Sequence, residues 1–276
     1  MLPFWLSIGC LSLLQALLVA LSRPAELPLL DRLRSGWWAR WLPVPIVVTI
    51  GVIALDSASA SFFTYLALVF VPPCAALALG MVIRGARPWL AVLVVPLFAL
   101  AWAAKGTFGG DTAATALSAL ACITLGWLLA CVVPSRWLKL GILAMAAIDA
   151  YLVGTELLQQ PNDVLNTVAP VADLPRLQLV HFGSAVMGFG DIFIAAALGA
   201  LLASDRRLQL GAAVIAAVVG CAFDLLFFAV DVLPSTVPIA LTLLIVEVWR
   251  RSESGDGESD EAGHERRRER DRAVGE

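Results

Sequence analysis

Long apolar stretches dominate the chain, and charged or Pro- and Gly-rich segments separate them. A helix needs about 20 apolar residues to cross the hydrocarbon core of a bilayer. Dividing the chain at these breaks predicts nine membrane-spanning helices, at about 2–22, 41–56, 60–83, 88–104, 112–133, 138–158, 176–203, 210–231 and 235–249. The stretch 41–83 is too long for one helix, and we expect "DSASAS" at 56–61 to form a turn within it.

The composition supports a membrane protein. Hydrophobic residues make up 60% of the 276 residues and charged residues 15%, with a mean hydropathy of +0.86. A soluble domain of this size cannot bury that much apolar surface, whereas a multi-span protein exposes it to lipid. The sequence therefore predicts an all-α polytopic protein over residues 1–249, embedded in a lipid bilayer. Residues 250–276 are rich in charge and almost free of apolar side chains, which predicts a disordered tail.

The positive charges orient the predicted helices. Twelve Lys or Arg residues lie in alternate loops and just after the last span, against two, Lys105 and Arg176, on the opposite side. Because Lys and Arg are enriched in cytoplasmic loops, this bias predicts an outside N-terminus and a cytoplasmic C-terminus. The Ala-, Leu- and Arg-rich composition, without a eukaryotic targeting signal, favours a bacterial plasma membrane.

The sequence contains no pattern that indicates a metal, a cofactor or nucleic acid. All five cysteines lie inside apolar runs, without a CxxC pair or a Cys/His cluster, so we interpret them as small apolar residues. No basic stripe typical of nucleic-acid binding is present. The sequence does not identify an accessory subunit.

Two aspartates within the predicted spans are the main candidates for chemistry. Asp149, in "AMAAIDAYLVG", lies near the centre of the sixth span, and Asp191, in "GFGDIFIAAALG", near the centre of the seventh. These antiparallel neighbours place both carboxylates at one depth, where they would share a proton. Such a pair can activate water and polarise a peptide carbonyl. Asp224, in "GCAFDLLFFAVD" of the eighth span, is a third acid at membrane depth and a candidate modulator.

The residues preceding Asp191 suggest how water and substrate reach it. Gly188 and Gly190 flank Phe189, and glycines at these positions would permit close backbone approach or local unwinding of the helix.

"GFGD" at 188–191, with Asp149 upstream, resembles the GxGD intramembrane aspartyl proteases, most closely the presenilin and signal peptide peptidase group, as a prokaryotic member. That family has nine spans, catalytic aspartates in spans six and seven, and a PAL motif at the start of span nine. "VPIALTLL" at 237–244 places Pro238, Ala240 and Leu241 where that motif is expected. The resemblance covers about 138–249, which would be the catalytic half.

The resemblance implies an intramembrane aspartic endopeptidase that cleaves transmembrane segments or remnant signal peptides. Asp149 and Asp191 would be catalytic, while Gly188, Phe189, Gly190 and the Pro238–Leu241 stretch would support or bind substrate. The chain departs from the family at two points, because Ile148 replaces the usual tyrosine before the first aspartate and Ile239 interrupts the PAL motif.

Three alternatives remain open. A prepilin-peptidase-like GxGD protease has a similar motif, but that family usually carries Lys where this chain has Phe193. A proton- or cation-coupled transporter also uses paired intramembrane carboxylates, and Asp224 would be a third site on its pathway. In a non-catalytic scaffold the acids would only make polar contacts between helices.

Overall fold

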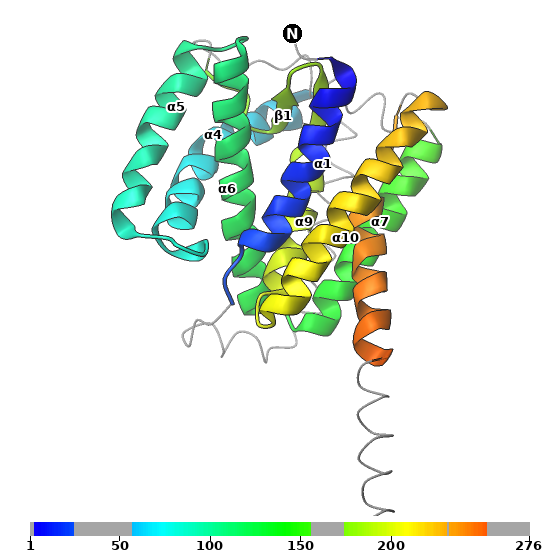
Figure 1. Ribbon diagram of the computed structural model, residues 1–276. Coiled ribbons are helices and arrows are strands. Elements are labelled where there is room, and N and C mark those ends of the chain that lie inside the picture. Colours follow the sequence, from blue (N-terminus) through cyan, green and yellow to red (C-terminus); the bar gives the residue numbers. More distant parts are fainter. Residues whose placement is uncertain (1–2, 25–56, 156–173, 231, 253–276) are drawn as a thin grey trace, which may run out of the picture.

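Eight α-helices and one short hairpin make up the described part of the molecule (Figure 1). The computed structural model describes residues 3–24, 57–155, 174–230 and 232–252. The helices are α1 (Phe4–Leu21), α4 (Ser57–Leu77), α5 (Val94–Ala103), α6 (Phe108–Val132), α7 (Ser135–Gly154), α9 (Phe189–Leu202), α10 (Arg206–Asp224) and helix 237–252. Short helical turns follow α4 (Ala78–Val82) and α10 (Leu225–Phe228) and precede α5 (Pro88–Leu93).

Among the described residues, five helices are long and apolar enough to cross a membrane, whereas the sequence predicted nine spans over the whole chain. They are Phe4–Leu21, Thr64–Val82, Phe108–Val132, Ser135–Gly154 and Arg206–Phe228. Pro88–Ala103 and Phe189–Leu202 are shorter apolar helices. The predicted span 41–56, most of the predicted outer loop at 159–175 and the predicted tail after residue 252 lie outside the described residues. The five long helices support a multi-pass integral membrane protein.

The predicted seventh span, 176–203, divides into a hairpin and a short helix. Strand β1 (Leu179–Phe182) pairs antiparallel with β2 (Ala185–Gly188), and α9 begins directly afterwards. Gly183 has a φ of 62°, which suits the two-residue turn between the strands. Val180, Ala185 and Met187 are buried, so apolar side chains that suggested a continuous helix instead cover one side of a hairpin. The same physical pattern, a short apolar run, fits either structure.

The core lies where α9 is packed between α1 and α6 (Figure 1). A Cβ on Gly199 of α9 would stand 2.7 Å from the backbone oxygens of Leu18 and Val19 in α1. A Cβ on Gly126 of α6 would stand 2.8 Å from the backbone of α9 at Ala196. Glycine therefore allows both neighbours of α9 to approach its backbone closely, as small residues commonly do between membrane helices.

A buried glutamine joins three helices at the end opposite the hairpin. Gln209 of α10 donates from Nε2 to the carbonyl oxygens of Ser22 (2.9 Å) and Gly199 (3.1 Å). Its Oε1 accepts from Arg84 (3.1 Å) and Arg206 (2.8 Å). These bonds satisfy carbonyl groups in and just after the last turns of α1 and α9, so the ends of α1, α9 and α10 are fixed together.

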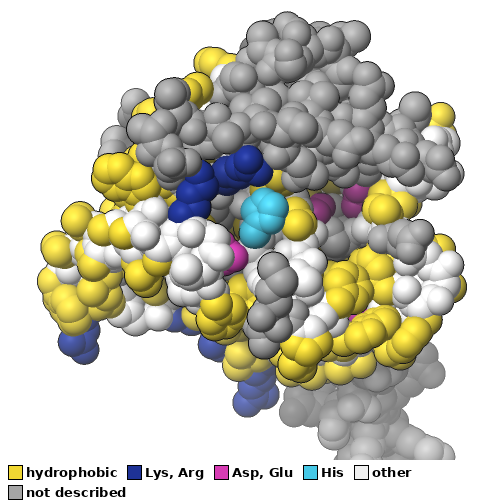
Figure 2. Space-filling model, turned by 90° about the horizontal axis from the view of Figure 1, so that it is seen from above, with side chains coloured by type: hydrophobic (Ala, Val, Ile, Leu, Met, Phe, Trp, Pro, Cys, Tyr) yellow, Lys and Arg dark blue, Asp and Glu magenta, His cyan; other side chains and the backbone are white. Residues whose placement is uncertain are grey.

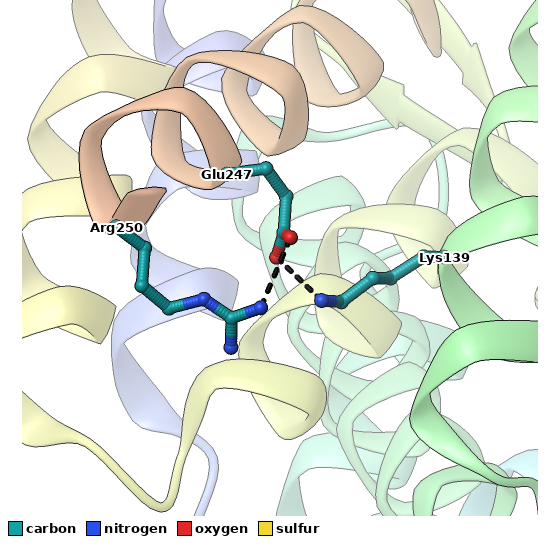
Figure 3. Close-up of polar contacts among 3 residues, drawn as sticks. All are labelled: Lys139, Glu247 and Arg250. Carbon is teal, nitrogen blue, oxygen red and sulfur yellow. Dashed lines mark hydrogen bonds and ion pairs between the residues drawn. The ribbon is translucent and has the colours of Figure 1, made fainter. Parts of the chain in front are cut away.

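Helix α7 packs against the core along one narrow face. Its buried residues form one narrow stripe, Leu138, Ile142 and Ala146. Near its start, the Lys139 ammonium lies 2.5 Å from the Glu247 carboxylate of helix 237–252, which also pairs with Arg250 at 3.1 Å (Figure 3). Toward its other end α7 carries Asp149.

Candidate active site

The sequence predicted Asp191 near the centre of the seventh span, and this was wrong. Asp191 lies in the first turn of α9. Because residues 179–188 form the hairpin, the helix begins only two residues before this aspartate. The Asp191 Oδ2 accepts a hydrogen bond from the Gly188 N–H at 3.1 Å and so caps the helix start. A carboxylate is stabilised at this position because the first-turn N–H groups and the helix dipole are electropositive there.

The two glycines of the GFGD motif have different surroundings. A Cβ on Gly188 would stand 3.2 Å from Asp191 Oδ2, which is tighter than most contacts of real Cβ atoms. A Cβ on Gly190 would have nothing within 4 Å, and Gly190 is exposed. Gly188 therefore permits the close contact with the carboxylate, while Gly190 leaves open space beside it. Phe189, the first residue of α9, packs against both hydrophobic clusters of the core.

Asp149 reaches the same place from α7. It lies five residues before the helix ends at Gly154, closer to the hairpin end than the predicted mid-span position. Its Oδ2 accepts a hydrogen bond of 2.6 Å from the Thr236 hydroxyl and a longer one, 3.4 Å, from the Thr236 N–H. Thr236 is buried and immediately precedes helix 237–252, so that helix start holds the Asp149 side chain.

The structure brings Asp149 and Asp191 together. Their charges lie close enough to interact electrostatically, and the Ser235 side chain lies next to the Asp191 carboxyl group. Ser235 and Thr236 are adjacent, so one short turn places a hydroxyl beside each carboxylate, and the Thr236 hydroxyl donates to Asp149. Two carboxyl groups with separate donors and mutual repulsion can hold one shared proton, which is the arrangement required for acid–base work on a carbonyl.

The sequence interpretation missed Ser235, Thr236 and a further residue of this site, Gln15. The Gln15 Nε2 donates to the backbone oxygens of Asp191 (3.2 Å) and Ser235 (3.3 Å). A signal was present for all three, because each is a polar residue inside a predicted apolar span. Which group of the site each residue contacts depends on packing between distant parts of the chain, and the hydrophobic periodicity of the sequence carries no information about that packing.

The Pro238–Leu241 stretch, which the resemblance assigned to substrate support, lies in the first turns of helix 237–252. Pro238 is the second residue of helix 237–252, where its missing N–H is not required by the helix. Ala240 is buried and Leu241 is 41% exposed. Ile239, the residue that interrupts the expected motif, is 1% exposed and belongs to the core. The non-helical segment beside the carboxylates is therefore upstream, at residues 232–236.

Asp224 is held elsewhere. It is the last residue of α10, and its Oδ2 accepts a 2.7 Å hydrogen bond from the Ser12 hydroxyl of α1. Ser12 is 4% exposed, so this contact docks α1 on α10 inside the molecule. The contact gives Asp224 a structural partner of its own.

The end of the molecule that carries the hairpin has a mixed surface. Seen from this end, acidic side chains, a histidine and Lys or Arg side chains lie among hydrophobic ones (Figure 2). His181, in β1, is partly buried, and its Nε2 has no hydrogen-bond partner among the described residues. Burial lowers the pKa of His181, Asp111 opposes that change, and Arg176 adds to it.

Within the described ranges, no group of three or more His, Cys, Asp or Glu side chains is arranged to hold a metal ion. The candidate site contains two carboxyl groups, the Ser235 and Thr236 hydroxyls, the Gln15 amide and the backbone N–H groups of Gly188 and Thr236. Comparison of the chain with protein-family models, curated proteins and solved structures gives no match.

Proposed function

We propose that this protein is an intramembrane aspartic endopeptidase whose catalytic groups are Asp149 and Asp191. The observation that carries the proposal is that two carboxyl groups from different helices lie close enough for their charges to interact, with the Thr236 hydroxyl donating to Asp149 and the Gly188 N–H donating to Asp191. A scaffold that needed only polar contacts between helices would separate two like charges in an apolar interior, because their repulsion is costly there.

The reaction follows from the shared proton. One ionised carboxylate accepts a proton from water as the water oxygen attacks the scissile carbonyl carbon, while the protonated partner donates to the carbonyl oxygen. The tetrahedral gem-diol then loses its C–N bond: the nitrogen takes a proton from one carboxyl group while a gem-diol hydroxyl returns its proton to the other, and a carboxylic acid and an amine result. Water is consumed and the pair returns to its singly protonated state.

Access to the pair supports hydrolysis of a membrane segment. Asp191 lies at a helix start next to a hairpin, and the space beside Gly190 is open. Both features bring water closer than a mid-helix position would. A substrate helix must also unwind locally, since its carbonyl groups are otherwise occupied by its own hydrogen bonds.

The proposed orientation places the hairpin end outside and the opposite end in the cytoplasm. α1 starts at the hairpin end, where Ser7 contacts Ser184, and ends beside Arg206, which donates to the Ala20 oxygen. Arg84 lies at that same opposite end, where it donates to the Ala203 oxygen. Positive residues at this end agree with the positive-inside rule for a cytoplasmic face. This orientation is similar to that of the signal peptide peptidases, and the resemblance implies that single spans with a cytoplasmic N-terminus, such as remnant signal peptides, are the substrates.

The test is cleavage of a transmembrane peptide by the detergent-solubilised protein. Wild type should cleave, and Asp149→Ala and Asp191→Ala should each abolish cleavage. Asp224→Ala should retain it, because Asp224 is bonded to Ser12 and not to the pair. Cleavage that persists in either of the first two variants would remove the catalytic assignment.

A further inference from the structure

Gln15 connects the first helix to both sides of the aspartate pair. Its side chain is 3% exposed and lies in the middle of α1, Phe4–Leu21. The Nε2 lies 3.2 Å from the backbone oxygen of Asp191 and 3.3 Å from that of Ser235. Both partners are carbonyl acceptors, so only the NH₂ side of the amide fits, and its two hydrogens serve both bonds.

The two acceptors belong to separate parts of the fold. Asp191 lies in the first turn of α9, and Ser235 lies in the turn before helix 237–252. They are more than 40 positions apart in the chain, with α10 between them. The amide therefore fixes the distance between the backbone of the α9 aspartate and the turn that places a hydroxyl beside each carboxylate.

The surroundings of Gln15 make this contact costly to lose. Leu11 and Leu18, one turn away on either side, are each 1% exposed, so the amide is buried among apolar side chains. A buried amide is tolerated only where its hydrogen bonds are made. Simple docking of α1 does not require these particular bonds, because α1 already contacts α10 through Ser12 and Asp224.

We infer that Gln15 is a positioning residue for the aspartate pair. It holds the turn at Ser235 against the start of α9, and thereby keeps the Thr236 hydroxyl, which donates to Asp149, fixed relative to Asp191. Gln15 touches no carboxyl group itself, so it acts through the turn and not on the substrate. This inference rests on the proposed peptidase function for its consequence in catalysis, but its geometric part is independent of that function.

The test compares two variants of Gln15 with a control on the same helix. Gln15→Met keeps an unbranched side chain of similar length but removes both donors, and Gln15→Asn keeps the donors on a shorter stem. Ser12→Ala removes another buried polar contact of α1, one turn away, and leaves the turn at Ser235 untouched. For each protein, kcat and KM are measured with one transmembrane peptide, together with backbone hydrogen exchange of the segment 232–242.

We expect Gln15→Met to lower kcat by about tenfold or more with KM changed less than about twofold, because a displacement below 1 Å in a catalytic group has effects of this size. Its Thr236 amide, which bonds Asp149, should exchange at least about five times faster than in wild type. The kcat and the Thr236 exchange rate of Gln15→Asn should lie between those of wild type and Gln15→Met. Ser12→Ala should match wild type in kcat and in the exchange of residues 232–242.

The outcomes separate the two hypotheses. Wild-type kcat in Gln15→Met, or an equal fall of kcat in Ser12→Ala, would overturn the positioning role. If wild type itself cleaves no peptide but the Thr236 amide still exchanges faster in Gln15→Met alone, the positioning role stands and the proposed peptidase function fails.

Discussion

Gly188 and Gly190 provide a matched pair of substitutions in one motif. Gly188 has φ −68° and ψ 148°, a conformation that alanine adopts without strain, so Gly188→Ala tests the side-chain space alone. The new Cβ would lie 3.2 Å from Asp191 Oδ2 and 3.7 Å from its Cγ. Relief of this contact requires the carboxyl group to move by a few tenths of an ångström, which also lengthens its 3.1 Å bond to the Gly188 N–H.

The expected effect of Gly188→Ala is on catalysis more than on stability. A misplacement of about 1 Å in a reacting group costs about 100-fold in rate, so a few tenths of an ångström should lower kcat by roughly three- to thirtyfold. The free energy of unfolding should change by less than about 1 kcal/mol, because only one capping bond is affected. Gly190→Ala meets no atom within 4 Å and should leave stability unchanged.

The assay is peptide cleavage under single-turnover conditions, with thermal unfolding in the same detergent as the control for folding. Equal, wild-type rates in both variants would refute the argument that the GFGD motif places the Asp191 carboxyl group through Gly188. A fall of rate in Gly190→Ala with unchanged unfolding would instead indicate that the open space beside Gly190 is where substrate lies.

Three further predictions follow from the contacts. Thr236→Val removes the hydroxyl bonded to the α7 carboxylate and should lower kcat by about tenfold, measured with the same peptide, whereas Thr236→Ser should largely restore it. Gly199→Ala places a Cβ against the α1 backbone at 2.7 Å and should lower the free energy of unfolding by about 1–3 kcal/mol or more, measured by denaturation in detergent. Burial lowers the pKa of His181 from 6.5, with Asp111 opposing and Arg176 adding, so the hairpin binds a proton less readily than its opened form. The contribution of neutral His181 to hairpin stability is therefore fully present above pH 6.5 and is lost as the pH falls through the lowered pKa. Hydrogen-exchange protection of residues 179–188, compared at pH 7.5 and pH 5, would detect this loss. His181→Gln should show no such loss.

The hydrophobic pattern predicts much of the helical structure, because burial and lipid exposure both require long apolar runs. The predicted span 138–158 corresponds to α7, Ser135–Gly154, and the predicted span 112–133 corresponds to α6, Phe108–Val132. The hairpin was missed because residues 176–203 were treated as one continuous span, although Gly183 and Ser184 between two short runs form the two-residue pattern typical of a hairpin turn. Strand pairing at Leu179↔Gly188 depends instead on the turn at Gly183 and on burial against α6 and α1.

In the candidate site, too, the local motif was readable from the sequence, whereas the contacts between distant segments were not. The GFGD motif and a second aspartate in a neighbouring apolar run predicted that Asp149 and Asp191 face each other; their charges interact in the structure, and their catalytic roles stay predictions. The predicted mid-span position of Asp191 was wrong, because it was counted along a continuous helix that the hairpin shortens. The hydroxyl partners and Gln15 come from segments far away in the chain, so their roles became visible only with the tertiary contacts.

The central claim is that Asp149 and Asp191 act as one catalytic unit. The direct measurement is the single-turnover cleavage rate of Asp149→Asn, Asp191→Asn and the double variant, each compared with wild type on one transmembrane peptide. Asparagine keeps the size of each side chain but cannot exchange the shared proton. The account predicts that all three variants fall to one common background rate, because groups that act as a unit are not additive. Cleavage that persists in one single variant, with a further loss in the double variant, would contradict it.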